Sequence, residues 1–245
     1  MSCRFIYFTL ALWASGVCAA CGNSHGRPLR DSAVVPPDQV VNFRTLYQQN
    51  CAGCHGIDGK GGVSIALSDP IFLAIADDDI IRGAATNGVR GTLMPAFGKT
   101  AGGMLTNQQI DSLVRGIRAW AKPEALQGVS PPPYAAQRQG DPRRGQVAYA
   151  TYCASCHGPD GRGGQKASSI VDRSYLALVS DQYLRIAVIA GRPELGAPDW
   201  RNDIPGRPLS SQEVSDVVAW LSAQKQTFSG QSYPESVANN VGEPR

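Results

Sequence analysis

The pentapeptide Cys-x-x-Cys-His occurs twice in this chain and constrains its fold more than any other feature. The copies span residues 51–55 and 153–157. This pattern is the attachment signature of a c-type haem: two thiols one helical turn apart form thioethers with the porphyrin vinyl groups, and the adjacent histidine coordinates the iron. Zinc sites and redox dithiols share Cys-x-x-Cys, but zinc needs further ligands. The only other histidine in the chain is His25.

We therefore expect two covalently attached haem c groups, one in each half of the chain. The residues expected to bind them are Cys51, Cys54 and His55 in the first half, and Cys153, Cys156 and His157 in the second. In this prediction His55 and His157 are the proximal ligands of the two irons.

Both motifs lie within a long internal repeat. Residues 56–62, which follow the first motif, match residues 158–164, and Tyr47 and Tyr149 each lie four residues before the first cysteine of their motif. The repeat continues through four later pairs: Gly88/Gly191, Pro95/Pro198, Phe97/Trp200 and Leu105-Thr106/Leu209-Ser210. Two long copies predict two tandem domains rather than a solenoid.

Composition supports two small domains built around cofactors. Hydrophobic residues make up 42% of the 245 residues, enough for two cores that are each enlarged by a buried porphyrin. The net charge is only +3 with 18% charged residues, so we expect no nucleic-acid partner. We find no obvious acid–base dyad, phosphate loop or nucleophile elbow, which favours an electron carrier over a stand-alone enzyme.

The N-terminus has the pattern of a secretory signal. A basic start is followed by an apolar run from Phe5 to Val17, which is short for a membrane-spanning helix, and then by small residues. Cys21 follows Ala19-Ala20 and precedes a glycine, as at a bacterial lipoprotein cleavage site, although Cys18 stands where leucine is usual. We expect export and a lipid anchor on Cys21, with ordinary cleavage after Ala20 as the alternative.

Proline-rich and polar stretches divide the chain further. The expected order is a signal peptide (1–20), a flexible tether with the possible lipid anchor (21–37), a first domain (38–122), a proline-rich linker (123–140), a second domain (141–226) and a disordered tail (227–245).

Helical periodicity dominates both domains, and no segment shows strand alternation, so we expect an all-α fold. Asp38 is expected to cap the first helix, and Asp141-Pro142 to begin the first helix of the second domain. Capping-box patterns at 106–109 and 210–213 predict the closing helices. Middle helices are expected over 77–82 and 181–189.

Each half resembles a class I cytochrome c domain, over residues 38–122 and 141–226. In that family the first and last helices cross closely, with a glycine on one helix against an aromatic residue on the other. Gly145 and Trp220 keep this pattern. The first domain has Phe43 at the glycine position and Gly116 at the aromatic one, which we interpret as a size swap across one contact.

The resemblance also implies a methionine as the sixth iron ligand. Met94, in the stretch Leu93-Met94-Pro95, fits that role, and Met104 is the competitor. In the second domain the position of Met94 is taken by Ala197, which cannot bind iron. That iron is then five-coordinate or holds water, or takes a ligand from a partner subunit or from Lys166, Lys225 or His25.

The resemblance implies single-electron transfer on the periplasmic side of a bacterial membrane. The expected partners are a redox donor and acceptor, with a larger respiratory or dehydrogenase complex as a further candidate. The alternative is a dihaem oxidoreductase, peroxidase-like or thiosulfate-oxidising, with substrate at the open second haem; a gas or redox sensor is a third class. Arg192, Arg201 and Asp199 flank Ala197 and are expected to be solvated loop charges or partners of haem propionates.

Overall fold

The computed structural model describes residues 35–126, 128–202 and 204–225. The predicted signal peptide, Cys21, His25 and the tail beyond residue 225 lie outside these ranges. Residues 35–39 belong to a unit separate from residues 40 onward and contain one 3₁₀ turn, η2 (Pro37–Gln39). Over the described ranges the β-type pairings are isolated bridges and form no sheet. The predicted all-α fold is confirmed.

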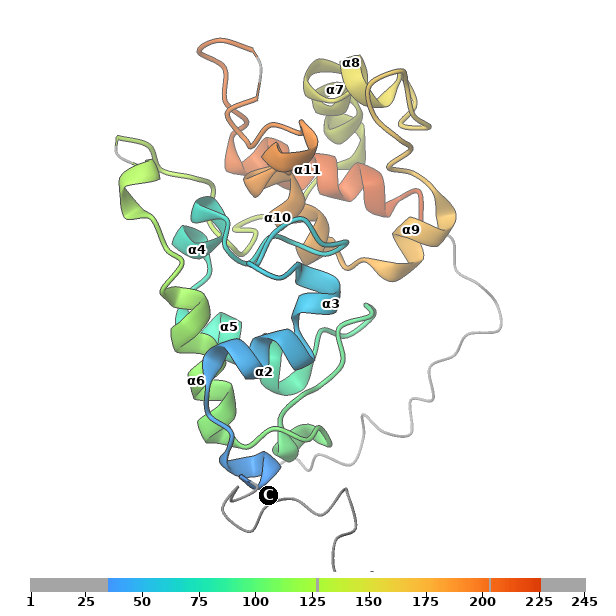
Figure 1. Cartoon of the computed structure of the whole chain (residues 1–245). Coiled ribbons are helices and arrows are strands. Elements are labelled where there is room, and N and C mark those ends of the chain that lie inside the picture. Colours follow the sequence, from blue (N-terminus) through green and yellow to red (C-terminus); the bar gives the residue numbers. More distant parts are fainter. Residues whose placement is uncertain (1–34, 127, 203, 226–245) are drawn as a thin grey trace, which may run out of the picture. The chain divides into compact units, whose positions relative to one another are not determined.

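The two halves contain the same series of α-helices but differ in their 3₁₀ turns, because η3 follows Phe97 whereas η5 precedes Ala197; the helices are coloured from blue to red along the chain in Figure 1. The first half has α2 (Phe43–Asn50), α3 (Ala52–His55), α4 (Pro70–Ile75), α5 (Asp78–Asn87), η3 (Lys99–Ala101), α6 (Asn107–Arg118) and η4 (Pro123–Leu126). The second half has α7 (Pro142–Tyr152), α8 (Ala154–His157), α9 (Arg173–Leu178), α10 (Asp181–Ala190), η5 (Pro193–Leu195) and α11 (Ser211–Ser222).

Most helix starts follow the expected capping chemistry. Both closing helices begin with a complete capping box, at Thr106 for α6 and at Ser210 for α11, and Asp141 caps α7 ahead of its proline. The predicted middle helices correspond to α5 and α10. The short helices α4 and α9 were not predicted; Asp69 and Asp172 cap them.

The predicted cap at Asp38 is wrong. The first helix begins at Phe43, and Asn42 caps it by accepting a hydrogen bond from the Thr45 N–H at 3.0 Å. The preceding backbone is held elsewhere, because the Val40 carbonyl accepts a hydrogen bond from the Gln109 side chain and the Val41 carbonyl accepts one from the Ser112 hydroxyl. Tertiary hydrogen bonds from α6 therefore keep residues 40 and 41 out of the helix.

In both domains the first helix packs against the last, and the predicted size swap is confirmed. A Cβ atom added at Gly145 on α7 would lie 1.9 Å from the Asp216 carbonyl oxygen and 2.8 Å from the Trp220 Cβ. In the first domain a Cβ at Gly116 on α6 would lie 2.0 Å from the Phe43 ring. In each domain the glycine allows the two helices to approach closely. It lies on the first helix of the second domain but on the last helix of the first domain.

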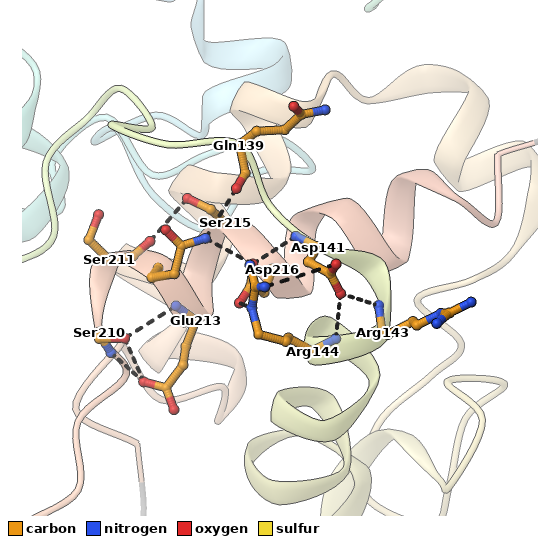
Figure 2. A network of polar contacts seen from close by, with 10 residues as sticks. Gln139, Asp141, Arg143, Arg144, Ser210, Ser211, Glu213, Ser215 and Asp216 are labelled. Carbon is orange, nitrogen blue, oxygen red and sulfur yellow. Dashed lines mark hydrogen bonds and ion pairs between the residues drawn. The ribbon is translucent and has the colours of Figure 1, made fainter.

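A buried carboxylate fastens α7 to α11, and Figure 2 shows the network around it. Asp216 accepts hydrogen bonds from the Asp141 N–H at 2.7 Å, from Arg144 Nε at 2.8 Å and from Gln212 Nε2 at 2.9 Å. Burial alone would raise the pKa of Asp216, but these donors hold its pKa below the ordinary value. The first helix of the second domain is thus tied at its N-terminus to the closing helix.

The proline-rich linker is non-helical apart from η4, and its final part is attached to the second domain. Arg185 on α10 is only 2% exposed, and its guanidinium donates to the carbonyl oxygens of Pro133 and Tyr134 and to the hydroxyls of Ser211 and Ser215. These acceptors are neutral. No sequence pattern had indicated a buried arginine at this position.

We predict that Gly145→Ala lowers the free energy of unfolding by about 1–3 kcal/mol, because the new methyl group overpacks the contact with α11. The matched control is Gly83→Ala in α5, where an added Cβ would meet nothing within 4 Å. That exchange should leave stability unchanged or raise it by about 0.5–1 kcal/mol. Chemical denaturation of the holoprotein measures both; equal effects at the two sites would contradict the close helix crossing.

The Asp216 network predicts a pH dependence. Because the folded pKa of Asp216 lies below its unfolded value, the stability that it contributes is present above about pH 4 and is lost as the pH falls through the folded pKa. Asp216→Asn should therefore be less stable than the natural chain at pH 7, and the two should converge in acid. A difference in unfolding free energy that is constant from pH 7 to pH 3 would exclude this role.

Candidate haem sites

Each haem motif forms a single helical turn directly after the first helix of its domain. Cys51 ends α2 and begins α3, and Cys153 does the same between α7 and α8. The four motif cysteines are free thiols; Cys51, Cys153 and Cys156 are half-buried and Cys54 is exposed. The turn places both thiols of a motif on the same side, as thioether attachment requires.

The ionisation of these thiols differs from that of a redox-active dithiol. Burial raises the pKa of Cys51 to about 12 and that of Cys153 to about 11, with a further contribution from the second cysteine of each motif. Reactive dithiols have the opposite property, a lowered pKa at an accessible cysteine. Cys51 and Cys153 therefore lack the lowered pKa that a reactive dithiol cysteine has.

Each motif histidine has a backbone partner at Nδ1, as an iron-ligating histidine requires. His55 Nδ1 is 2.9 Å from the Ile65 carbonyl oxygen, and His157 Nδ1 is 2.9 Å from the Ser168 carbonyl oxygen. A carbonyl acceptor at Nδ1 selects the tautomer in which Nε2 has a free lone pair for a metal. His55 is 6% exposed, and burial lowers its pKa, so it is neutral near pH 7 as a ligand must be. The donor sets thus fit two c-type haems.

A tyrosine and a tryptophan support the loop behind each motif. The Tyr47 hydroxyl donates to the Gly56 carbonyl oxygen at 2.9 Å, and the Tyr149 hydroxyl donates to that of Gly158. The Tyr47 ring meets Trp120 edge-on with centroids 5.0 Å apart, whereas Tyr149 stacks on Trp220 at 4.2 Å. Both tyrosines are buried, which raises their pKa, so the hydroxyls stay protonated donors.

The loops of the expected sixth ligand have matching backbone hydrogen bonds in the two domains. The Val89 N–H donates to the Met94 carbonyl at 3.0 Å, and the Arg192 N–H donates to the Ala197 carbonyl at 2.9 Å. Farther on, Leu105 N–H donates to the Phe97 carbonyl at 2.7 Å, and Leu209 N–H to the Trp200 carbonyl at 2.8 Å. Ala197 therefore occupies the structural position of Met94.

The other candidate ligands are placed elsewhere. Met104 is 81% exposed, whereas Met94 is half-buried. Lys225 Nζ donates to the Val179 carbonyl at 2.9 Å and to Asp181 at 2.8 Å. Lys166 is exposed on the loop whose Ser168 carbonyl faces His157, which is the proximal side. His25 lies outside the described residues.

The charged residues beside Ala197 are paired. Arg192 Nε is 2.6 Å from Glu194, and Arg201 Nε is 2.9 Å from Asp199. The Arg201 guanidinium also lies over the Trp200 ring, 5.0 Å from its centroid. Arg201 is 47% exposed, whereas Arg192 is 17% and Asp199 12% exposed, so the expectation of solvated loop charges is wrong for Arg192 and Asp199.

Comparison with known proteins identifies the two halves. A family model described as cytochrome c oxidase, cbb3-type, subunit III matches residues 38–115 and, a second time, residues 140–221. The chain belongs to this family. It consists of tandem cytochrome c domains that carry two covalently attached haem c groups, as predicted from the motifs.

Curated relatives include two cbb3-type cytochrome c oxidase subunits CcoP. The one from Azospirillum sp. (strain B510) is 31% identical over 52% of this chain and 42% of its own length, and the one from Rubrivivax gelatinosus is 30% identical over 57% and 41%. The chain thus spans less than half the length of these relatives. Among the described residues of this protein, none of the helices is both long and apolar enough to cross a membrane.

Among solved structures, the reducing HAO-like protein complex Kustc0457/Kustc0458 of Kuenenia stuttgartiensis matches with a TM-score of 0.42 and 18% identity. The match covers 75% of this chain and 96% of that chain. A TM-score this low supports no functional comparison.

We predict two haems per chain by the pyridine haemochrome assay, both retained in acidified organic solvent because thioethers hold them. Replacing Cys153 and Cys156 with alanine should reduce the content to one covalent haem and leave the spectrum of the His55 site unchanged. The matched exchange of Cys51 and Cys54 should leave only the second. Extraction of either haem from the natural chain would contradict covalent attachment.

Proposed function

We propose that this protein is a dihaem electron carrier with two inequivalent haems. His55 and Met94 ligate the first iron, and His157 ligates the second, whose distal side lacks a methionine. Haem supplies the one-electron chemistry, and the chain determines its potential and its distance from partners. The observation that carries this proposal is that Ala197 accepts the same backbone hydrogen bond in its loop that Met94 accepts in the first domain.

Differences in ligation and burial support different reduction potentials. Methionine ligation raises the potential of a c-type haem, and burial of the proximal histidine keeps water away from the site. Met94 and the buried His55 both belong to the first domain, while His157 is half-buried. The first haem then has the higher potential, and an electron that enters at the second haem moves downhill to the first.

Pairing of the loop charges favours electron transfer over catalysis at the second haem. Peroxide cleavage needs a distal group that can accept and return a proton. Arg192 is engaged by Glu194 and Arg201 by Asp199. The four charged residues nearest Ala197 in the described part of that loop are therefore held in ion pairs, although the open iron could bind a neutral diatomic molecule.

Location and partners are part of the proposal. The relatives named above are subunits of cbb3-type oxidases. By analogy, this chain would pass electrons within a larger respiratory complex on the periplasmic side of the membrane. Export through the predicted signal and attachment through lipidated Cys21 would keep the two domains at the membrane surface. Co-purification with oxidase subunits from solubilised membranes would identify the complex.

We predict that the ferrous second haem binds carbon monoxide while the first haem does not. Ala197→Met should suppress this binding and raise the reduction equilibrium constant of the second haem by about tenfold or more, ~59 mV for one electron. The reciprocal exchange Met94→Ala should open the first haem. Carbon monoxide titration and redox potentiometry give both readouts.

Leu195→Met is the matched control, because it adds a thioether to the same loop at a side chain that is 71% exposed. It should leave carbon monoxide binding unchanged. Two methionine-ligated haems in the natural chain would overturn the inequivalence. Peroxide turnover by the purified holoprotein would instead favour the dihaem oxidoreductase.

A further inference from the structure

Arg192 connects the two haem sites by direct hydrogen bonds. Its backbone N–H donates to the Ala197 carbonyl at 2.9 Å, and the Ala197 N–H donates back to the Arg192 carbonyl at 3.1 Å. Its side chain extends the other way: the terminal nitrogen donates to the Gly62 carbonyl oxygen at 2.7 Å. Arg192 is thus hydrogen-bonded both to Ala197, at the position expected for a distal ligand of the second haem, and to Gly62 in the glycine-rich loop of the first domain.

Gly62 lies directly behind the first haem motif. A Cβ atom added there would lie 2.2 Å from the Cys54 carbonyl oxygen, which also accepts a hydrogen bond from the Ser64 N–H at 3.0 Å. The loop that Arg192 contacts therefore packs on the backbone of a haem-attaching cysteine. A displacement of Gly62 would move Cys54 with it.

The Arg192 side chain is held in one conformation. It is 17% exposed, and Glu194 binds its Nε at 2.6 Å, so the guanidinium uses separate nitrogens for Glu194 and for Gly62. Arg192 lines a small cavity together with Tyr183 and Ile186 of α10. Ile65, Asp69 and Phe72 of the first domain line its other side. Ile65 supplies the carbonyl that orients His55.

The repeat shows that this connection is specific to the second domain. The counterpart of Arg192 is Val89, which makes the same backbone hydrogen bond but has no polar side chain. Arg201 in the same loop is paired with Asp199, two residues away. Arg192 is therefore an addition to the common scaffold that the loop geometry alone does not require.

We propose that Arg192 is a positioning residue that couples the two haem sites, so that a change at one haem alters the environment of the other. The proposal rests on the proposed function in one respect, that residue 197 faces the second haem. Coupling between sites is reciprocal. Because a bridge of short hydrogen bonds and a packed side chain moves as a unit, loss of the side chain should disturb both haems rather than one.

The test uses the full holoprotein with Arg192→Ala, Arg192→Lys and Arg201→Ala. Arg192→Ala and Arg201→Ala each remove one positive charge and leave one carboxylate unpaired, so they match in charge. Arg192→Lys keeps the charge but loses the planar fork that binds Glu194 and Gly62 together. The readouts are the paramagnetically shifted haem-methyl resonances of the oxidised protein and the midpoint potential of each haem. Haem content and thermal unfolding are recorded to exclude misfolding.

We expect both Arg192 variants to shift the methyl resonances of both haems and to change the reduction equilibrium constant of the first haem by about fivefold. Arg201→Ala should change that constant less than twofold. If Arg192→Lys behaved like the natural chain, the effect of Arg192 would be due to its charge alone and the proposal would be overturned. Unchanged methyl resonances of the first haem in Arg192→Ala would also overturn it. Neither readout uses carbon monoxide. The coupling proposal can therefore fail or succeed independently of the prediction that the second haem binds carbon monoxide.

Discussion

In each half the first and last helices cross with a glycine at their contact, and the haem site is built outward from that crossing. The haem motif follows the first helix without a break, at Cys51 and at Cys153. The crossing therefore sets the direction from which the thiols and the histidine approach the porphyrin. The carbonyl oxygens of Ile65 and Ser168 then orient the histidine rings from the loop behind.

The two domains meet this constraint with different residues. In the second, Gly145 on α7 accommodates Trp220, whose ring stacks on Tyr149. In the first, Phe43 fills the contact against Gly116, and the ring that reaches Tyr47 comes from Trp120, beyond the end of α6. In both domains a tryptophan ring thus contacts the tyrosine, but Trp220 lies within the last helix and Trp120 lies just beyond it. Volume at the crossing is preserved while residue identity is not.

Alanine can stand at position 197 without loss of the loop's backbone hydrogen bonds, and this has a physical basis. The Met94 and Ala197 loops are held by backbone hydrogen bonds, which do not depend on the side chain at that position. Alanine can therefore replace methionine there while the hydrogen bond to its carbonyl oxygen is kept. The backbone hydrogen bond that Arg192 donates is also made by Val89 in the first domain, so it does not depend on the side chain. An arginine can therefore stand at position 192 and contact Gly62 without loss of that bond.

The sequence alone predicted what local chemistry specifies: the haem motifs and the capping boxes at Thr106 and Ser210. It did so because cysteine spacing and caps depend on neighbours along the chain. The glycine–aromatic exchange joins helices far apart in the chain, and the resemblance to class I cytochrome c domains implied it. The cap of the first helix was placed at Asp38 instead of Asn42. The reason is tertiary: side chains of α6 donate hydrogen bonds to the carbonyl oxygens of Val40 and Val41, so the helix begins only after Asn42. The short helices α4 and α9 span six residues each, too few to show a helical period. Two contacts could not be predicted from the sequence. Arg185 donates to Tyr134 in the linker, 51 positions away, and Arg192 donates to Gly62, 130 positions away; only packing in three dimensions brings such groups within hydrogen-bonding distance.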